Sequence, residues 1–196
     1  MGLVAALEWL GQPYRLSRVD MLNEMKTPDY LRLNPRGETP VLITGERRVL
    51  TETMAIALWI EARDVERRVS FAPGTPEADR LHQLVAFINT GFTAAFTPYW
   101  VAIELAAPEP DYQAALCRLG HDAVNERHAR MGELIGDTRY LLGDRPTLAD
   151  AVFIGVARWA AFHAAVAPGA YPRTPALIDR LRADPAVAYA QAVEDG

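Results

Sequence analysis

The stretch NPRGETPVL, residues 34–42, places Gly37 and Pro40 directly before an apolar strand pattern. Pro40 follows Thr39 and has no backbone N–H to contribute to a sheet. This arrangement indicates either an ordinary trans turn, or a cis Thr39–Pro40 bond at a strand end that is left open. In the second case the backbone N–H and C=O of Thr39 can pair with an extended peptide ligand.

A second stretch, LTETMAI at residues 50–56, places two threonines and a glutamate where a strand ends and a helix begins. The first N–H groups of a helix have no partner inside the helix, and the helix dipole is positive there, so this position suits a carboxylate. The hydroxyl of Thr53 can add one more donor. The alternative is plain capping of the helix by Thr51 or Thr53.

Short helices and strands surround these two stretches. Apolar residues at i, i+3, i+4 and i+7 predict a helix over residues 3–10, closed by Gly11 and Pro13. Further elements are predicted from residue pattern: a strand at 14–19, a helical turn at 27–33, a hairpin joining 41–43 to 48–50, and a helix at 54–60. Residues 1–70 are therefore expected to form a mixed α/β domain.

A linker rich in proline and glycine follows at residues 71–76, and beyond it no strand pattern is found. Apolar periodicity and capping residues predict helices at 77–105 (bent near Pro98), 112–135, 147–163, 175–183 and 185–194. Residues 77–196 are therefore expected to form an all-helical domain.

One segment of this helical part, from Leu84 to Ile103, has no charged side chain. It also contains asparagine, threonine, glycine and proline, and it lacks a strongly hydrophobic centre. A buried helix or a subunit interface is therefore a better interpretation than a membrane span, and no membrane partner is expected.

The composition is that of a folded protein, with 50% hydrophobic residues, 23% charged residues and a formal net charge of −5 over 196 residues. This balance excludes a disordered or fibrous chain, and the lack of a basic patch argues against nucleic-acid binding. The single cysteine, Cys117, excludes an internal disulfide, and the first residues show no signal-peptide pattern. A reduced, cytoplasmic setting is expected.

Taken together, the stretches at 34–42 and 50–56 resemble the glutathione S-transferase family at the family's spacing, with the closest similarity to the bacterial beta class. Residues 6–14 resemble the family's first helix and second strand, residues 87–98 its fourth helix, and residues 144–151 its sixth helix. The resemblance implies a thioredoxin-like N-terminal domain followed by an all-helical C-terminal domain. It also implies a homodimer that acts in detoxification.

The same resemblance implies a site for glutathione, as co-substrate, beside a site for a small electrophile. Thr53 and Glu52 would hold the γ-glutamyl end, and Thr39 before a cis Pro40 would pair with the cysteinyl unit. Lys26, the only lysine, falls where the family often has a cation for the glycyl carboxylate, although it could equally be a solvated surface residue. The acceptor pocket would lie between the domains and would be lined by Phe92, Thr93, Phe96, Tyr99, Trp100 and Trp159. The alternative for each aromatic residue of this set is a place in the hydrophobic core.

Two other groups of polar residues are interpreted as structural. Thr147 and Asp150 have the spacing of a capping box, with aspartate in place of the usual glutamate or glutamine. Cys117 and His121 share one helix face, but a metal site needs three or four converging ligands, so no metal is expected. Cys117 is expected to be a buried small hydrophobe.

Two departures from the family pattern bear on activity. Family members begin with a strand and a loop that delivers the Tyr, Ser or Cys that activates the thiol, whereas Met1 already lies at the first helix. Either the biological protein starts earlier, or it is a homologue that fills the gap differently. Thr93 also stands where beta-class proteins tend to have a histidine. The predictions are therefore a glutathione transferase whose catalytic residue is unassigned, or a non-catalytic binding or regulatory protein of the same fold.

Overall fold

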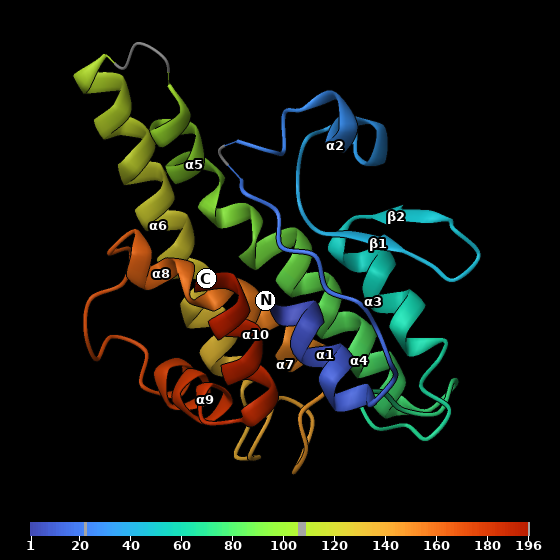
Figure 1. Cartoon of the computed structure of the whole chain (residues 1–196). Helices are drawn as coiled ribbons and strands as arrows, with labels where there is room; N and C mark the ends of the chain where they lie inside the picture. Colours follow the sequence, from blue (N-terminus) through green and yellow to red (C-terminus); the bar gives the residue numbers. More distant parts are fainter. Residues whose placement is uncertain (22, 106–108, 196) are drawn as a thin grey trace.

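The first part of the chain folds into short helices and one small hairpin (Figure 1). The structure is a computed structural model that describes residues 1–21, 23–105 and 109–195. The elements of this part, in chain order, are α1 (Gly2–Leu10), α2 (Pro28–Leu33), β1 (Val41–Ile43), β2 (Val49–Thr51) and α3 (Thr53–Glu61). Gly11 ends α1 in a left-handed conformation at φ 70°, as its position after the apolar run predicts.

The predicted hairpin is confirmed. β1 and β2 pair antiparallel, with Leu42 opposite Leu50 at the centre of the ladder. The turn is closed by the Thr44 N–H, which donates to the Arg48 carbonyl over 2.9 Å, and Arg47 takes a positive φ of 61° within it. Because β2 leads directly into α3, the hairpin fixes where the helix starts.

The prediction of a strand at residues 14–19 is wrong, since these residues form no strand in the described structure. The burial of residues 14–17 alternates as in a strand, with Tyr14 and Leu16 half-buried and Arg15 and Ser17 exposed, but the alternation is lost at Arg18. The described sheet, however, contains only β1 and β2. A strand needs a neighbouring backbone to pair with, and no described segment lies in pairing register beside this one.

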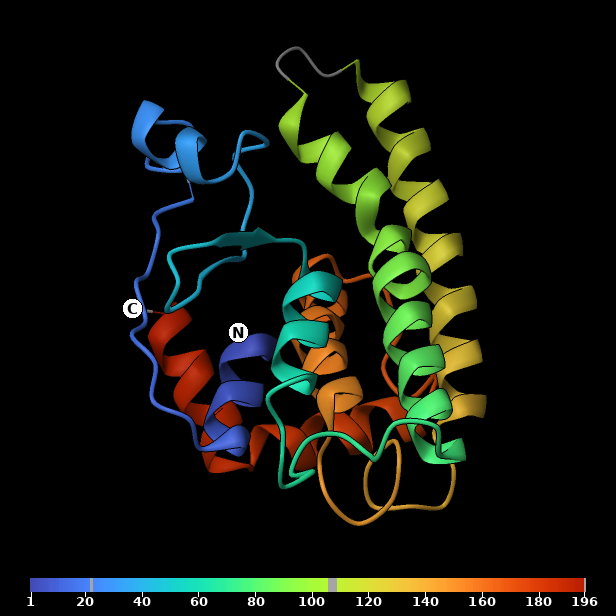
Figure 2. The ribbon, with the colours of Figure 1, turned by 90° about the vertical axis from the view of Figure 1, so that its right-hand side faces the viewer.

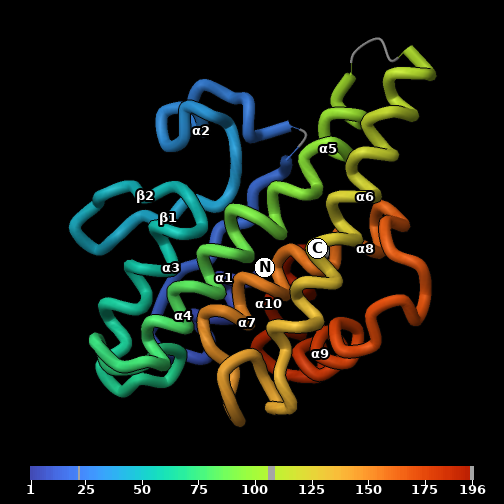
Figure 3. The backbone as a smooth tube through the Cα atoms, turned by 180° about the vertical axis from the view of Figure 1, so that it is seen from behind, coloured from blue at the N-terminus to red at the C-terminus, as the bar shows by residue number. Residues whose placement is uncertain are grey.

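The second part of the chain is helical, as predicted. Its helices are α4 (Pro76–Phe87), α5 (Thr97–Glu104), α6 (Pro110–Leu134), α7 (Leu148–Ala157), α8 (Trp159–Phe162), α9 (Arg173–Arg182) and α10 (Pro185–Asp195). Two short turns join α4 to α5. The turn at Ile88–Phe92 is π-helical, wider than an α-helix, and the turn at Ala94–Phe96 is 3₁₀, tighter than an α-helix. Figure 3 shows this α4–α5 run lying beside α6.

Two of the predicted helix boundaries need correction. The long helix at 77–105 breaks before Pro98, at the π-helical turn, where the Thr93 N–H donates to the Ile88 carbonyl five residues back at 2.8 Å. Pro98 instead lies in the first turn of α5, where its missing N–H is not needed. The helix predicted at 147–163 is divided at Arg158 into α7 and α8.

The core forms around α7, which is buried without interruption from Leu148 to Ile154. Figure 2 shows α3 and α7 in the middle of the molecule, with α1 and α10 on one side and the α4–α5 run and α6 on the other. α1 packs on both α7 and α10, and the Trp9 indole N–H donates to Asp184 at the start of α10 over 2.9 Å. The two halves therefore share one continuous core.

None of the helices in the described ranges is both long enough and apolar enough to cross a membrane. The uncharged run from Leu84 to Ile103 is divided between α4, the two turns and α5. Many of its apolar side chains lie in the core, among them Leu84, Ile88 and Phe92. Burial in the core therefore explains why much of this run has no charged residue.

Candidate functional site

A cavity of about 320 Å³ lies between the mixed half and the helical half. Six residues on the β1–α3 side line it: Asn34, Glu38, Thr39, Pro40, Glu52 and Thr53. Six residues on the helical side complete it: Asn89, Thr93, Ala94, Thr97, Trp100 and Trp159. Residues of the two stretches 34–42 and 50–56 thus meet at one site.

The peptide bond between Thr39 and Pro40 is cis. The loop before it is held by the Asn34 side chain, whose amide donates to the Glu38 carbonyl over 2.7 Å. The Tyr30 hydroxyl donates to the same carbonyl over 2.8 Å. Within the described ranges the backbone of Thr39 itself makes no hydrogen bond, and the residue is exposed. An extended ligand can therefore pair with Thr39 without displacing an existing contact.

Glu52 and Thr53 form the start of α3. Glu52 has a positive φ of 68°, which turns the chain sharply from β2 into the helix. Among the described residues no side chain caps the helix, so the alternative role of Thr51 or Thr53 as a cap is not realised. The first N–H groups of α3 and the Thr53 hydroxyl remain available at the cavity, an arrangement that suits a carboxylate.

An ion pair borders this side of the cavity. The Arg36 guanidinium donates to both carboxylate oxygens of Glu38, at 2.9 and 3.1 Å. This contact holds the pKa of the Glu38 carboxyl below its usual range. Glu38 is therefore ionised at neutral pH, and Arg36 largely balances its charge.

Lys26 does not line the cavity. Its ammonium donates to the carbonyls of Gly37, at 3.3 Å, and of Arg36, at 3.4 Å, and its side chain is exposed. Gly37 has a positive φ of 63°, and a Cβ there would lie 2.9 Å from the Lys26 nitrogen. Lys26 thus braces the turn before Thr39, and its contact with a ligand carboxylate stays a prediction.

The predicted acceptor residues divide into two groups. Thr93, Trp100 and Trp159 line the cavity. Phe92 and Phe96 are fully buried and Tyr99 is 8% exposed, so the prediction that these three rings line a pocket needs correction. They lie on the face of the segment that packs into the core, and Phe92, for example, packs on Phe153 with ring centroids 5.7 Å apart.

Several lining residues were not singled out by sequence reasoning, namely Asn34, Glu38, Asn89, Ala94 and Thr97. The signal for part of this set is the spacing of Asn89, Thr93 and Thr97, which recur every fourth residue as a polar stripe on an otherwise apolar segment.

The capping box at α7 is present. The Thr147 N–H donates to the Asp150 carboxylate over 2.8 Å, and the Thr147 hydroxyl donates to it over 2.9 Å. The Leu141 N–H donates to the other carboxylate oxygen over 3.0 Å. Asp150 is fully buried and lies away from the cavity, so its role is to join the loop before α7 to the helix.

The possible metal ligands are scattered. In the part of the chain that the structure describes, no three His, Cys, Asp or Glu side chains come together. His121 is exposed beside Asp122, and Cys117 is half-buried.

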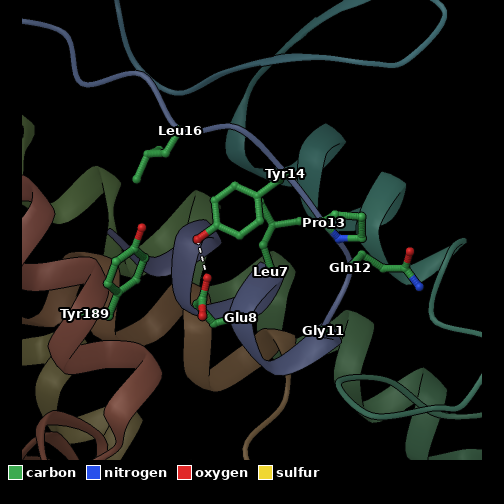
Figure 4. Close-up of a pocket in the computed structure, with 8 residues that line it drawn as sticks. All are labelled: Leu7, Glu8, Gly11, Gln12, Pro13, Tyr14, Leu16 and Tyr189. Atoms are coloured by element: carbon green, nitrogen blue, oxygen red, sulfur yellow. Dashed lines mark hydrogen bonds between the residues drawn. The ribbon is translucent and has the colours of Figure 1, made fainter.

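A second cavity, of about 450 Å³, lies between α1, the extended segment after it and α10 (Figure 4). Leu7, Leu16 and Tyr189 are among its lining residues, and the Tyr14 hydroxyl donates to Glu8 over 2.5 Å within it. Burial and the Glu8 carboxylate both raise the pKa of Tyr14. Tyr14 therefore stays protonated and acts as a donor to Glu8.

Comparison with known proteins identifies relatives along most of the chain. The family models for the glutathione S-transferase N-terminal domain and C-terminal domain match residues 2–63 and 87–185. Glutathione S-transferase GST-4.5 of Xanthomonas campestris is 29% identical over 159 residues, which are 79% of this chain and 74% of the relative.

Two solved structures illustrate the likeness in fold. A sphingomonad glutathione S-transferase complexed with glutathione superposes with a TM-score of 0.83 at 23% identity, covering 99% of this chain and 93% of that one. The beta-class enzyme of Sphingomonas chungbukensis gives 0.82 at 24% identity, covering 98% of this chain and 92% of that one. These matches confirm the predicted fold class, a thioredoxin-like N-terminal half with a small sheet followed by a helical half.

Proposed function

Because the chain belongs to the glutathione S-transferase family, we propose that it binds glutathione in the cavity between its two halves and conjugates it to small electrophiles. The observation that carries this proposal is the convergence of Thr39, cis Pro40, Glu52 and Thr53 at one cavity. An exposed, unpaired backbone edge beside a free helix start matches a tripeptide that carries carboxylates, an amine and a thiol.

Each part of glutathione has a partner in this arrangement. The γ-glutamyl carboxylate would accept from the first N–H groups of α3 and from the Thr53 hydroxyl, while Glu52 would face the γ-glutamyl ammonium. The cysteinyl unit would pair with the backbone of Thr39. Lys26 would approach the glycyl carboxylate from beside the turn at Gly37, after releasing one of its two hydrogen bonds to the carbonyls of Arg36 and Gly37.

The chemical step is a nucleophilic attack by the thiolate of glutathione. A bond forms between sulfur and an electrophilic carbon, and the leaving group departs with its bonding electrons, or an added proton completes the product of an addition. Thr93 lines the cavity and can contribute a hydrogen bond, but a hydroxyl cannot act as a base near neutral pH. The residue that activates the thiol stays unassigned.

A non-catalytic binding or regulatory role is the second candidate. It is favoured by the composition of the helical wall, where none of the lining residues from Asn89 to Trp159 has a side chain that could take a proton from a thiol at neutral pH. Glutathione-dependent turnover of an activated aryl halide separates the two candidates, since only an enzyme accelerates this reaction above the rate of the free thiol.

We also propose that the protein works as a homodimer in the cytoplasm. The support is family membership alone, since the structure describes a single chain. Light scattering at micromolar concentration tests the assembly, and a molar mass near 21.7 kDa, that of one chain, would contradict the dimer.

Calorimetric titration with glutathione tests the binding proposal. We expect saturable binding, and we expect Thr53→Ala to weaken it by about 1–2 kcal/mol, the scale of a hydrogen bond to a charged group. Thr90→Ala is the matched control, because Thr90 is exposed and donates to the Ala86 carbonyl outside the cavity. No heat at millimolar glutathione would overturn the proposal.

A further inference from the structure

The cavity beside α10, of about 450 Å³, lies apart from the cavity between the two halves (Figure 4). Its lining residues come from the end of α1, from the segment that follows this helix, and from Tyr189 on α10. Among the described residues, none lines both cavities. The volume is in the range of small-molecule sites. A ligand bound here would therefore leave the proposed glutathione site free.

Packing fixes the walls of this cavity. α1 packs along α10, and the Trp9 indole N–H holds the start of α10 through its hydrogen bond to Asp184. Val187 and Ala190, which flank Tyr189 in the sequence, are 0% and 2% exposed. The helix that carries Tyr189 is therefore anchored in the core, and the cavity is formed before any ligand binds.

The cavity carries a negative charge. Of its lining residues in the described ranges, Glu8 alone is charged. A cation at its edge, the Arg68 guanidinium beside Gly11, is paired with Glu66 at 2.6 Å. An anionic ligand would therefore meet a like charge in this cavity, whereas a cationic ligand would meet an opposite one.

Three oxygen-bearing groups lie together in the cavity. The Tyr14 hydroxyl donates to Glu8 Oε1 over 2.5 Å, and Glu8 Oε2 has no hydrogen-bond partner within residues 1–21, 23–105 and 109–195. Burial, the Glu8 carboxylate and the Tyr189 hydroxyl all raise the pKa of Tyr14, so the three groups are close neighbours. Figure 4 shows the two hydroxyls near the carboxylate. Each hydroxyl oxygen can still accept a hydrogen bond.

These groups match the donors of a primary ammonium, which has three N–H donors and no acceptor. Glu8 Oε2 and the hydroxyl oxygens of Tyr14 and Tyr189 offer three acceptors, one of them charged. The two tyrosine rings add the attraction of an aromatic face for a cation. A quaternary ammonium would keep the attraction of the charge and the rings, but it could donate no hydrogen bond.

Apolar side chains form much of the remaining surface of the cavity. Leu7 and Leu16 are half-buried, and Pro13 lies between them in the sequence. An apolar group placed against these side chains would be removed from water. A ligand that uses the whole cavity therefore combines a cationic end with an apolar body.

We propose that this cavity binds a small organic cation, a primary ammonium joined to an apolar body. The ammonium donates to Glu8 Oε2 and to the hydroxyl oxygens of Tyr14 and Tyr189, and the body lies against Leu7 and Leu16. The site is independent of the proposed glutathione site, and it takes ligands of the opposite charge.

Four probes of similar shape test the proposal: 2-phenylethylammonium, its N,N,N-trimethyl derivative, 2-phenylethanol and phenylacetate. Titrations followed by the amide resonances of the protein in NMR spectra measure each affinity and locate each probe, with ammonium chloride as the control for ionic strength. We expect 2-phenylethylammonium to shift the resonances of the lining residues with a dissociation constant of about 1 mM or lower.

The order of the four affinities reports the chemistry of the site. The primary ammonium should bind about tenfold more tightly than 2-phenylethanol, the scale of a hydrogen bond to a charged group. It should bind about threefold more tightly than the trimethyl derivative, which cannot donate. Phenylacetate should not bind, because its carboxylate would face Glu8.

Substitutions identify the residues responsible. Glu8→Gln keeps an oxygen that can accept from Tyr14 and removes the charge, so the advantage of the ammonium over the alcohol should fall to about twofold or less. Glu77→Gln is the matched control, because Glu77 is an exposed helix glutamate outside the cavity. Tyr189→Phe keeps the ring and removes one acceptor, so it should weaken the primary ammonium about threefold and leave the trimethyl derivative unchanged. Thermal unfolding shows whether each variant is folded.

The outcomes decide the proposal and leave the proposed function separate. The proposal is wrong if 2-phenylethylammonium shifts no resonance of the lining residues, if the alcohol or phenylacetate matches it, or if Glu8→Gln keeps its advantage. Tighter binding of the trimethyl derivative would overturn the primary ammonium as the ligand class. Saturating glutathione should leave the affinity for 2-phenylethylammonium unchanged, and direct competition between the two would show that the sites are not independent.

Discussion

His128 is an unusual residue of the helical half. It lies on α6, is 3% exposed, and packs against Phe92 at 4.9 Å and Tyr171 at 5.8 Å between ring centroids. Neither ring nitrogen has a hydrogen-bond partner in the part of the chain that is described. Burial lowers the pKa of His128 to about 4, so the folded protein holds this histidine in its neutral form.

This burial predicts a loss of stability in mild acid. Below the ordinary histidine pKa of about 6.5, the unfolded chain takes up a proton that the folded protein does not accept until about pH 4. The free energy of unfolding should therefore fall as the pH decreases from about 6.5 to 4, by roughly 3 kcal/mol from this group. Urea denaturation at several pH values measures the effect.

His128→Phe is the control, because it keeps an aromatic ring between Phe92 and Tyr171 and removes the titration. Its free energy of unfolding should be less dependent on pH than that of the wild type over the same interval. Comparing the two proteins cancels the contributions of other groups, such as Asp64 and Asp150. Parallel curves for the two proteins would contradict the prediction.

At the scale of elements, the close packing of α1 on α7 depends on glycine. A Cβ built on Gly2 would lie 2.1 Å from the Ala151 carbonyl oxygen and 3.3 Å from the Gly155 Cα. Backbone atoms cannot move aside as a flexible side chain can, so a side chain at residue 2 would push the helices apart.

Gly2→Ala should therefore lower the free energy of unfolding by about 1–3 kcal/mol, the usual cost of overpacking a core. Gly132→Ala provides the matched control, since Gly132 lies in α6 and no atom of the described residues comes within 4 Å of an added Cβ. There alanine should be neutral or stabilising by up to about 1 kcal/mol, because it is the better helix former. Equal effects at the two glycines, measured by thermal unfolding, would show that the α1–α7 contact is looser than described.

At the scale of the whole molecule, Arg145 joins the helical half to the end of the mixed half. Its guanidinium donates to the carbonyls of Arg68, at 2.7 Å, and Ser70, at 2.8 Å, and stacks 4.9 Å from the Phe71 ring. The Leu148 N–H adds a bond of 2.9 Å to the Val69 carbonyl. These contacts hold residues 68–71, at the start of the predicted linker 71–76, against the loop and helix start at residues 145–148. The division of the chain at the linker stays a prediction.

Arg145→Met should keep the aliphatic contact with Phe71 and remove both hydrogen bonds. We expect a loss of about 1–3 kcal/mol in the free energy of unfolding, because charge-assisted bonds to two carbonyls disappear. Calorimetric unfolding should also broaden, since the two halves become less strongly coupled. Arg139→Met, outside this junction, is the control, and an unchanged transition in Arg145→Met would rule out the bridging role.

Features set by contacts between near neighbours in the chain could be derived from the sequence. The hairpin, the helix start at Thr53 and the capping box of Thr147 with Asp150 each depend on residues a few positions apart, and the structure contains all three. Residues of the stretches 34–42 and 50–56 line one cavity. The family resemblance, added to the same local signals, led us to expect them at a common site.

Features that depend on distant partners could not be derived in this way. Phe92, Phe96 and Trp100 follow one another on one aromatic segment, yet two face the core and one lines the cavity, because α6, α7 and α8 determine which side of the segment is covered. The sequence of the stretch 14–19 has the alternation of a strand, but a strand also needs a neighbouring backbone to pair with, and among the described residues the sheet contains only β1 and β2. The sequence by itself therefore determines local conformation and which functional groups are present, whereas packing between distant segments determines which side chains reach the cavity.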